Sequence, residues 1–382
     1  MRVSPTLTRT GIYPFARLEE AKRAAAARGV DLIDLGVGDP REQTEEFIQR
    51  ALVDALPRTS GYPLAQGLPE LRGAITRWCA RRFGVDLDPD AQVIPTLGSK
   101  EAIFSFAQVL VDPEAGRDLV AVTEPGYPVP ERGALFAGAE PLLVPLHERN
   151  GFLPDLDSIP EETWQRLALF WVNYPNNPTG ATAPRELLAR LSELARRHDF
   201  VLAADEAYSE LWYEAPPASV LELGDLRNVV AFNTLSKRSS MTGYRSGFVA
   251  GDAQVIGALR TFRPTVGTAP QEFVQRASVA AWDDEAHVER TRGRYARKRA
   301  LFSDLFARKG VRLAGSVATI YLWFEVPAGE NSEAFATRLL EHGIVVSPGS
   351  YFGATGEGYA RIALVPSLAD CERAVSILED VL

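Results

Sequence analysis

Cysteine, histidine and lysine are scarce in this 382-residue chain, and the first two shortages each remove a class of function. The two cysteines, Cys79 and Cys371, are far apart and form no CxxC pair, which excludes a disulfide framework and a thiolate metal site. The four histidines stand alone, without the spacing of metal ligands, so no metal site is predicted.

Long apolar runs and an excess of positive charge are also missing. The longest apolar stretches, such as residues 167–172 and 229–232, are far shorter than the roughly 18 residues of a membrane-spanning helix. Residues 1–23 contain no apolar core of signal-peptide type, so we expect a cytoplasmic protein that does not enter a membrane. The net charge of −9 argues against nucleic-acid binding. The densest basic run, residues 290–299, has the spacing of a solvated helix face.

The composition that remains is that of an ordinary globular protein. Hydrophobic residues make up 46% and charged residues 24% of the chain, which leaves disorder and coiled-coil structure without support. At roughly 100 to 200 residues per domain, the length fits two domains or one large α/β body. Only five of the 41 basic residues are lysines, so each can be considered individually: Lys22, Lys100, Lys237, Lys298 and Lys309.

Short apolar segments alternate with helical segments from about residue 92 onward. Several apolar segments lack alternating polar residues, which is typical of strands buried on both faces of a parallel sheet. Helices are predicted between them at residues 99–111, 129–137 and 184–198, which gives the βαβ pattern of a large α/β sheet. The predicted strands are residues 93–95, 119–123, 141–145, 167–172, 200–204, 229–232 and 247–250.

The pattern changes after about residue 280. A charged helix over residues 284–309 is followed by a strand, a helix, two short strands and a final helix, at residues 319–326, 332–342, 344–347, 359–364 and beyond. We therefore expect an α/β fold whose large domain, residues 45–280, contains a mostly parallel seven-stranded sheet. Residues 1–44 and 281–382 are expected to form a smaller, discontinuous α+β domain.

Familiar nucleotide and hydrolase motifs do not occur. The chain has no GxxxxGK[ST] phosphate loop and no GxSxG nucleophile elbow. The nearest dinucleotide pattern, Gly36-Val37-Gly38, precedes Asp39-Pro40 rather than a helix. Kinase and hydrolase functions are therefore disfavoured.

Polar residues instead gather in loops at the predicted carboxyl ends of the strands, where open α/β sheets bind ligands. The helix that begins at Ser99 offers free backbone N–H groups and a positive dipole end to an anion. Singly, each loop residue has an ordinary structural interpretation. Jointly they supply an amine, a carboxylate, an aromatic ring, hydroxyl and amide donors and an arginine, which together can hold pyridoxal 5′-phosphate. The residues are Thr96–Lys100, Tyr127, Asn173–Gly180, Asp205, Glu206, Tyr208, Thr234, Ser236, Lys237 and Arg245.

Several segments also carry a resemblance to a known family. TLSKRSSMTGYRSG (residues 234–247), NYPNNPTG (173–180) and ADEAYSEL (204–211) resemble the fold-type I aminotransferases of class I and II, which use pyridoxal phosphate. GYPLAQGLPELR (61–72), TLGSKEA (96–102) and RIALV (361–365) follow in the family's order and approximate spacing. The departures are slight, since Thr234 stands where many members have serine and Tyr244 where many have tryptophan.

The resemblance implies three catalytic residues. Lys237 would link covalently to the cofactor and shuttle the substrate proton. Asp205 would keep the pyridine nitrogen protonated, and Tyr208 together with Asn177 would hydrogen-bond the 3′-oxygen. Tyr127 would stack on the ring.

The resemblance also implies the remaining contacts. The phosphate would be bound by the backbone amides of Gly98, Ser99 and Lys100, the hydroxyls of Thr234 and Ser236, and Arg245. Arg361 would hold the substrate α-carboxylate, with Asn177 and the Gly38 backbone nearby. Tyr62 would reach the phosphate of a neighbouring subunit, which implies a homodimer with composite sites.

A finer likeness concerns the substrate. Residues 237–239, 248–252, 275–288, 320–327 and 348–353 resemble the N-succinyl-LL-diaminopimelate aminotransferases of lysine and cell-wall biosynthesis, which exchange the amino group with glutamate and 2-oxoglutarate. The additional carboxylates of such a substrate need further cations, for which Arg17, Arg238 and Arg263 are candidates. An aspartate, aromatic or other generalist aminotransferase, a lyase of the same fold and a non-catalytic regulator module remain as alternatives.

Overall fold

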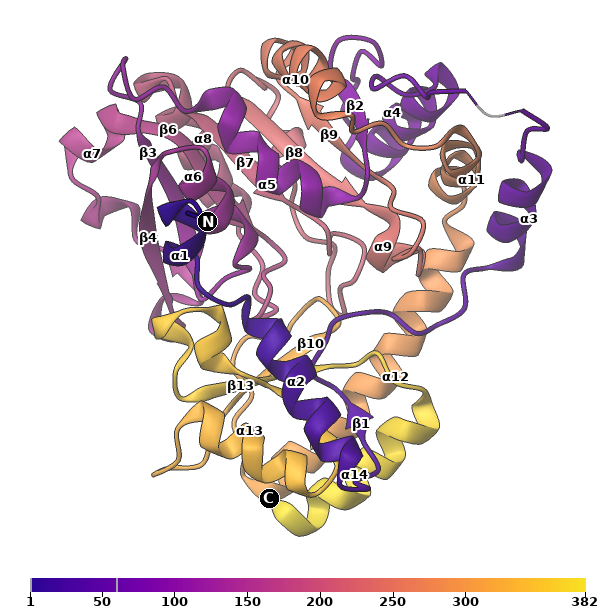
Figure 1. Ribbon diagram of the computed structural model, residues 1–382, viewed down its shortest axis with the longest axis vertical. Coiled ribbons are helices and arrows are strands. Elements are labelled where there is room, and N and C mark those ends of the chain that lie inside the picture. The colour runs from indigo at the N-terminus through magenta and orange to yellow at the C-terminus, as the bar shows by residue number, and fades with distance from the viewer. Residues whose placement is uncertain (1, 60) are drawn as a thin grey trace.

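The computed structural model describes residues 2–59 and 61–382, with a large body above a smaller one (Figure 1). An eight-stranded sheet in the order β2-β9-β8-β7-β6-β3-β4-β5 forms the centre of the large body. The bounds are β2 (Val93–Thr96), β9 (Gly247–Gly251), β8 (Val229–Thr234), β7 (Val201–Asp205), β6 (Leu167–Asn173), β3 (Leu119–Glu124), β4 (Glu140–His147) and β5 (Leu153–Pro154).

Most neighbours in this sheet run parallel, as predicted. The pairs β4–β3, β3–β6, β6–β7 and β7–β8 are parallel, whereas β9 is antiparallel to both β8 and β2. The structure adds β5 to the seven predicted strands as an eighth, pairing antiparallel with the end of β4. The sequence pattern did not predict β5 because a strand of two residues has no periodicity.

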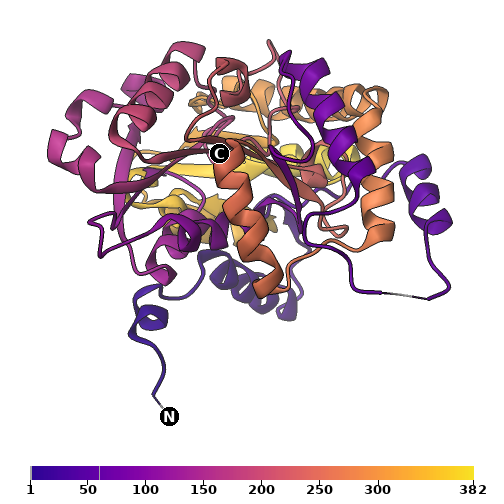
Figure 2. The same ribbon diagram turned by 90° about the horizontal axis from the view of Figure 1, so that it is seen from above.

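Helices cover both faces of the sheet, which explains why β6, β7 and β8 are buried along their whole length (Figure 2). Alternate strand residues belong to two separate hydrophobic clusters. One cluster includes α5 (Ser99–Leu110), α6 (Val129–Phe136) and α10 (Ala253–Val266). The other includes α4 (Pro69–Phe83), α7 (Glu161–Arg166), α8 (Arg185–His198) and α11 (Glu272–Asp283).

The smaller body brings together the two ends of the chain. Strand β1 (Ile33–Asp34) pairs in parallel with β11 (Ile344–Val345). The division into a large domain and a discontinuous small domain, with limits at residues 44/45 and 280/281, stays a prediction. An antiparallel sheet is formed by β10 (Tyr321–Glu325), β13 (Tyr359–Ala363) and β12 (Ser347–Pro348). The helices here are α2 (Pro14–Ala27), α12 (Ala286–Lys309), α13 (Ser332–Glu341) and α14 (Leu368–Val381), and the short helices elsewhere are α1 (Pro5–Arg9), α3 (Glu46–Asp54) and α9 (Leu235–Arg238).

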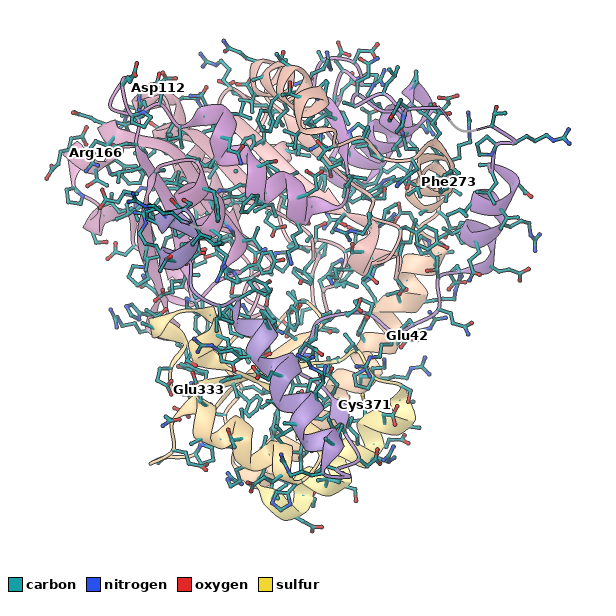
Figure 3. The ribbon with its side chains drawn as sticks, in the orientation of Figure 1. Glu42, Asp112, Arg166, Phe273, Glu333 and Cys371 are labelled. Carbon is teal, nitrogen blue, oxygen red and sulfur yellow. The ribbon has the colours of Figure 1, made fainter. Side chains whose placement is uncertain are left out.

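The cysteines lie in different bodies of the molecule. Cys79 is buried in α4 of the large body. Cys371, labelled in Figure 3, is buried in α14 of the small body. Both are free thiols, so no disulfide joins them. No helix within residues 2–59 and 61–382 has the length and apolarity needed to cross a bilayer.

Candidate active site

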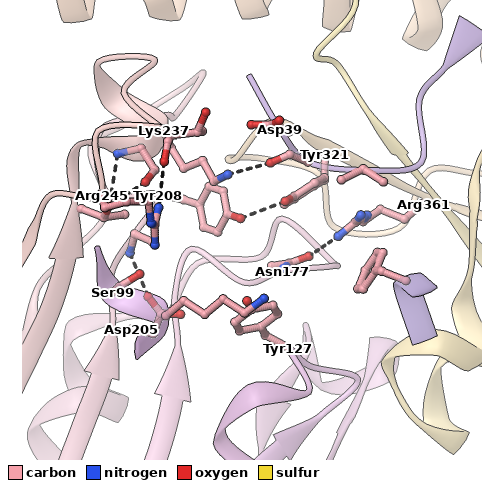
Figure 4. Close-up of a pocket in the computed structure, with 18 of the residues that line it drawn as sticks. Asp39, Ser99, Tyr127, Asn177, Asp205, Tyr208, Lys237, Arg245, Tyr321 and Arg361 are labelled. Atoms are coloured by element: carbon pink, nitrogen blue, oxygen red, sulfur yellow. Dashed lines mark hydrogen bonds between the residues drawn. The ribbon is translucent and has the colours of Figure 1, made fainter. Parts of the chain in front are cut away.

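A cavity of about 600 Å³ lies where the carboxyl ends of β7 and β8 meet the small body. Its large-body wall comes from the loops after these strands and from the start of α5, while its small-body wall includes Tyr321 and Arg361 (Figure 4). The lining residues are Tyr13, Phe15, Val37, Gly38, Asp39, Ser99, Lys100, Tyr127, Asn177, Asp205, Ala207, Tyr208, Thr234, Ser236, Lys237, Thr242, Gly243, Arg245, Tyr321 and Arg361.

One end of the cavity is built to receive an anion. Helix α5 begins at Ser99 with no side chain capping its first N–H groups. The hydroxyls of Thr234 and Ser236 lie 2.9 Å apart beside it. Arg245 is fixed by hydrogen bonds to the carbonyls of Thr242 (2.8 Å) and Leu97 (3.0 Å). Amides, hydroxyls and a guanidinium therefore converge on one point, as phosphate requires.

Gly98 is the residue that lets Arg245 approach this point. Its φ of +75° lies in the left-handed region. A Cβ built at Gly98 would come within 2.5 Å of Arg245 Nη2. The glycine thus meets both a backbone and a packing requirement of the anion site.

Asp205 is a buried carboxylate at the end of β7. From the described residues its side chain accepts one hydrogen bond, from the Ala207 N–H (3.2 Å). Burial raises the pKa of Asp205 to about 7, against the opposing effects of that N–H and of the Lys237 charge. A protonated ring nitrogen in the cavity would supply the partner that this carboxylate lacks.

Lys237 lies at the opposite side of the cavity, on the short helix α9. Its Nζ donates to the Gly38 carbonyl at 2.6 Å. Burial lowers the pKa of the Lys237 amine to about 8. The Asp39 carboxylate opposes this shift, whereas the positive charges of Arg361 and Arg245 add to it. An amine with a lowered pKa is suited to act as a nucleophile and as a base.

Arg361 is a buried cation that keeps an unused hydrogen-bond donor. Its guanidinium donates to Asn177 Oδ1 (2.7 Å) and to the Gly36 carbonyl (2.6 Å). Its Nε has no hydrogen-bond partner among the described residues. The backbone N–H of Asn177 is in turn held by Asn173 Oδ1 (2.8 Å), at the end of β6. Arg361 is therefore placed to bind a carboxylate that enters the cavity.

These groups fit pyridoxal phosphate. The anion site matches its phosphate, and the Lys237 amine matches its aldehyde. The Asp205 carboxylate, which accepts one hydrogen bond from the described residues, matches its ring nitrogen. Tyr127 and Tyr208 also line the cavity, as expected for contacts to the cofactor ring and its 3′-oxygen. Burial holds the pKa of the Tyr208 phenol well above its ordinary value, so its hydroxyl keeps its proton.

The predicted site residues are brought together with few exceptions. Gly98 lies directly behind Arg245 rather than on the cavity wall. Tyr62 is fully exposed and does not line the cavity of its own chain. The residues that do line it are Gly38, Ser99, Lys100, Tyr127, Asn177, Asp205, Tyr208, Thr234, Ser236, Lys237, Arg245 and Arg361. Their individual roles stay predictions.

None of the three arginines expected to bind distal carboxylates lines the cavity. Arg238 is buried against Trp282, 4.8 Å from its ring centre, and pairs with Glu285 (3.1 Å). Arg263 is buried and pairs with Glu101 (2.9 Å). Arg17 is exposed on α2. The expectation was wrong for Arg238 and Arg263 because acidic residues from distant segments neutralise them elsewhere.

Several residues of the cavity wall were not predicted from the sequence. Lys100 was assigned a backbone role, but its side chain also lines the cavity, with Nζ 5.0 Å from the centre of the Tyr13 ring. Tyr321 sits in the predicted strand 319–326, where an aromatic residue is expected simply to pack in the core. Asp39 follows Gly38, and no sequence motif indicated that it lines the cavity. Tyr13, Phe15, Thr242 and Gly243 were also not predicted.

The fold and the cavity together define a fold-type I enzyme that uses pyridoxal phosphate. The sequence model of the family aminotransferase class I and II matches residues 30–378, and the chain belongs to this family of pyridoxal-phosphate-dependent aminotransferases.

Named relatives agree with this assignment. The chain is 41% identical to the LL-diaminopimelate aminotransferase of Nitratidesulfovibrio vulgaris (strain Hildenborough) over 371 residues, 95% of each chain. A solved structure of substrate-bound BacF from Bacillus subtilis superposes with a TM-score of 0.94 at 31% identity, covering 100% of this chain and 98% of that one. A probable N-succinyldiaminopimelate aminotransferase from Thermus thermophilus gives a TM-score of 0.88 at 34% identity, covering 96% and 100%.

Gly98→Ala should weaken cofactor binding by displacing Arg245. We expect the Kd for pyridoxal phosphate to rise roughly 10- to 100-fold, the range for losing one charged hydrogen bond. Gly116→Ala is the matched control, because Gly116 has a similar φ of +73° but no atom within 4 Å of its added Cβ. Titration of each apoprotein variant with pyridoxal phosphate measures its Kd. Equal Kd values for the two variants would contradict the role of Gly98.

Proposed function

We propose that this enzyme transfers an amino group between LL-diaminopimelate and 2-oxoglutarate. The observation that carries the proposal is one further cation that lines the cavity, in addition to the three needed for the cofactor and the α-carboxylate. Arg245 is committed to the anion site, Lys237 to the cofactor and Arg361 to the α-carboxylate, which leaves Lys100. Lys100 makes no ion pair within the described part of the chain, so a second substrate carboxylate would complete it.

Each of these two cations lies near one ring of an aromatic pair, Phe15 and Tyr13. The Arg361 guanidinium lies 5.5 Å from the Phe15 ring centre, and Lys100 Nζ lies 5.0 Å from that of Tyr13. The two ring centres are 5.7 Å apart. This arrangement supports a substrate with a carboxylate at each end, a class that includes diaminopimelate, glutamate and 2-oxoglutarate. The names of relatives that are 41% identical support diaminopimelate within it.

The mechanism follows from the positions of the chain's own residues. When bound, the cofactor supplies an aldehyde that takes the amino group and a ring that delocalises the electron pair left at the substrate Cα. Arg361 orients the α-carboxylate, and Asp205 keeps the ring nitrogen protonated. Lys237 would remove the proton from the substrate Cα and would deliver it to the carbon that receives the amino group. The second half-reaction reverses these steps with 2-oxoglutarate.

N-succinyl-LL-diaminopimelate is the second candidate, supported by the sequence likeness and by the 34% identical Thermus structure. The two substrates differ at the distal nitrogen, which is an ammonium in LL-diaminopimelate and a neutral amide in its N-succinyl derivative. The relatives with 41% identity favour the free ammonium form. A generalist aspartate or aromatic aminotransferase would use the same cofactor residues.

A single-turnover experiment tests the function. The purified enzyme is mixed separately with LL-diaminopimelate, its N-succinyl derivative, glutamate and aspartate, and the formation of pyridoxamine phosphate is followed by absorbance. We expect glutamate and LL-diaminopimelate to react at least about 10-fold faster than the others.

Two variants control the experiment. Lys237→Ala should lower the rate by a factor on the order of 10² to 10⁴ and should lose the cofactor that borohydride fixes to the wild-type protein. Lys309→Ala, at the end of α12, should match the wild type. Faster reaction of the N-succinyl compound would replace the proposed substrate, and reaction of none would refute the aminotransferase activity.

Lys100→Met tests the assignment of the distal carboxylate. The variant keeps the length of the side chain and removes its charge. We expect the KM of glutamate to rise roughly 10-fold, as for loss of a charge-assisted hydrogen bond, with little change for alanine, which has no second carboxylate. Steady-state kinetics with both amino acids decide the question. Equal increases for the two substrates would show that Lys100 acts on the cofactor instead.

We further propose a homodimer in which Tyr62 completes the site of the neighbouring subunit. Tyr62 is fully exposed, and the apolar side chains of Val53, Leu56 and Leu64 near it in sequence are more than half exposed. Exposed apolar side chains gathered on one segment are typical of a protein interface. Helix α3, which contains Val53, lies at the edge of the large body (Figure 1).

Subunit mixing tests the shared site. Tyr62→Phe should raise the Kd for pyridoxal phosphate several-fold, and Lys237→Ala should be inactive. When the two variants are mixed and allowed to exchange subunits, half of the dimers are mixed and each contains one wild-type site. At limiting cofactor the mixture should therefore recover about a quarter of wild-type activity. No recovery on mixing would show that Tyr62 does not act across the interface.

A further inference from the structure

Tyr321 is a small-body residue that contacts the predicted machinery of the large body. It lies on β10 and is buried, and its phenol oxygen is 2.9 Å from that of Tyr208. The two rings meet edge to face, with centroids 5.5 Å apart. This hydrogen bond joins the β10 strand to the loop after β7 inside the cavity (Figure 4).

The Tyr321 ring also supports the substrate-binding arginine. The Arg361 guanidinium carbon lies 4.1 Å from the ring centre, a cation–π distance. Register places the two residues on adjacent strands, since Tyr321 pairs with Ala363 and Trp323 with Arg361. One side of Tyr321 therefore faces Arg361, and its hydroxyl faces Tyr208.

Gly38 makes room for the Tyr321 hydroxyl. A Cβ at Gly38 would lie 2.0 Å from Tyr321 Oη, so no larger residue fits there. The carbonyl of the same Gly38 accepts the hydrogen bond of Lys237 Nζ at 2.6 Å. Tyr321 thus packs against Gly38, stacks on Arg361 and hydrogen-bonds Tyr208.

We propose that Tyr321 is a positioning residue that links the substrate carboxylate at Arg361 to the hydrogen bond that Tyr208 donates to the cofactor. The inference rests on the proposed roles of Arg361 and Tyr208. If Tyr208 donates its hydrogen to the cofactor 3′-oxygen, the hydrogen between the two phenols must come from Tyr321. Donation by Tyr321 polarises Tyr208 and makes it a stronger donor, because hydrogen bonds in a buried chain reinforce one another.

Two substitutions separate the hydroxyl from the ring. Tyr321→Phe keeps the ring beneath Arg361 and removes the donor to Tyr208. A weaker Tyr208 donor leaves more negative charge on the 3′-oxygen, which stabilises a proton on the nearby Lys237 nitrogen. The absorbance titration of the bound cofactor, without substrate, should therefore shift to higher pH by up to about one unit. The kcat with glutamate should fall several-fold, and its KM should stay within about twofold.

Tyr321→Leu removes the ring as well. It should show the same spectral shift and, in addition, a KM for glutamate raised roughly 2- to 30-fold, the range of a cation–π contact. Tyr208→Phe should shift the titration further, and the double variant Tyr208→Phe, Tyr321→Phe should add nothing to Tyr208→Phe alone. Tyr295→Phe is the matched control, since Tyr295 is a buried phenol whose hydroxyl has no partner among the described residues.

The outcomes are distinct. An unshifted titration in Tyr321→Phe, or an additive shift in the double variant, would overturn the link through Tyr208. A shift of equal size in Tyr295→Phe would also overturn it, because any lost buried hydroxyl would then suffice. If Tyr321→Leu does not fold, the phenylalanine variants still decide the proposal. A wild-type protein that carries no titrating cofactor on Lys237 would instead refute the proposed function.

Discussion

The hydrogen bond from Lys237 to the Gly38 carbonyl joins the two bodies of the molecule inside the candidate active-site cavity. Lys237 is on α9, directly after the central strand β8, whereas Gly38 follows β1, which pairs with β11 in the small body. The amine can reach its partner only when the small body closes the cavity against the ends of the strands. The geometry of the site therefore depends on how the two bodies pack.

The same closure creates the electrostatic conditions of the site. Buried charges are costly unless they are paired, and the cavity brings the cations Lys237, Arg245 and Arg361 together with the Asp205 carboxylate. With few partners inside the protein, the pKa of Lys237 falls to about 8 and that of Asp205 rises to about 7. Both pKa values therefore lie close to neutral pH, and an added phosphate, ring nitrogen and carboxylate can pair with the charged groups of the cavity.

The buried arginines outside the cavity differ from Arg361 in their partners. Arg238 and Arg263 are as deeply buried as Arg361, but each is paired with a glutamate. Arg361 is bonded to neutral oxygens of Asn177 and Gly36, so its charge stays uncompensated until an anionic ligand binds. The identity of the partner, rather than burial, distinguishes the site arginine from the other two.

The sequence by itself determined the order of the elements and most of the residues that line the cavity. Apolar runs predicted the buried strands, and residues directly after them, such as Asp205 and Lys237, were expected to meet because parallel strands end at one edge of the sheet. Only the tertiary structure decided the wall facing that edge. The Tyr321–Tyr208 bond and the glutamate partners of Arg238 and Arg263 join segments 47 to 162 residues apart, and the position of Lys100 over Tyr13 likewise joins distant segments. Such contacts depend on the packing of the two bodies, and local periodicity contains no information about them.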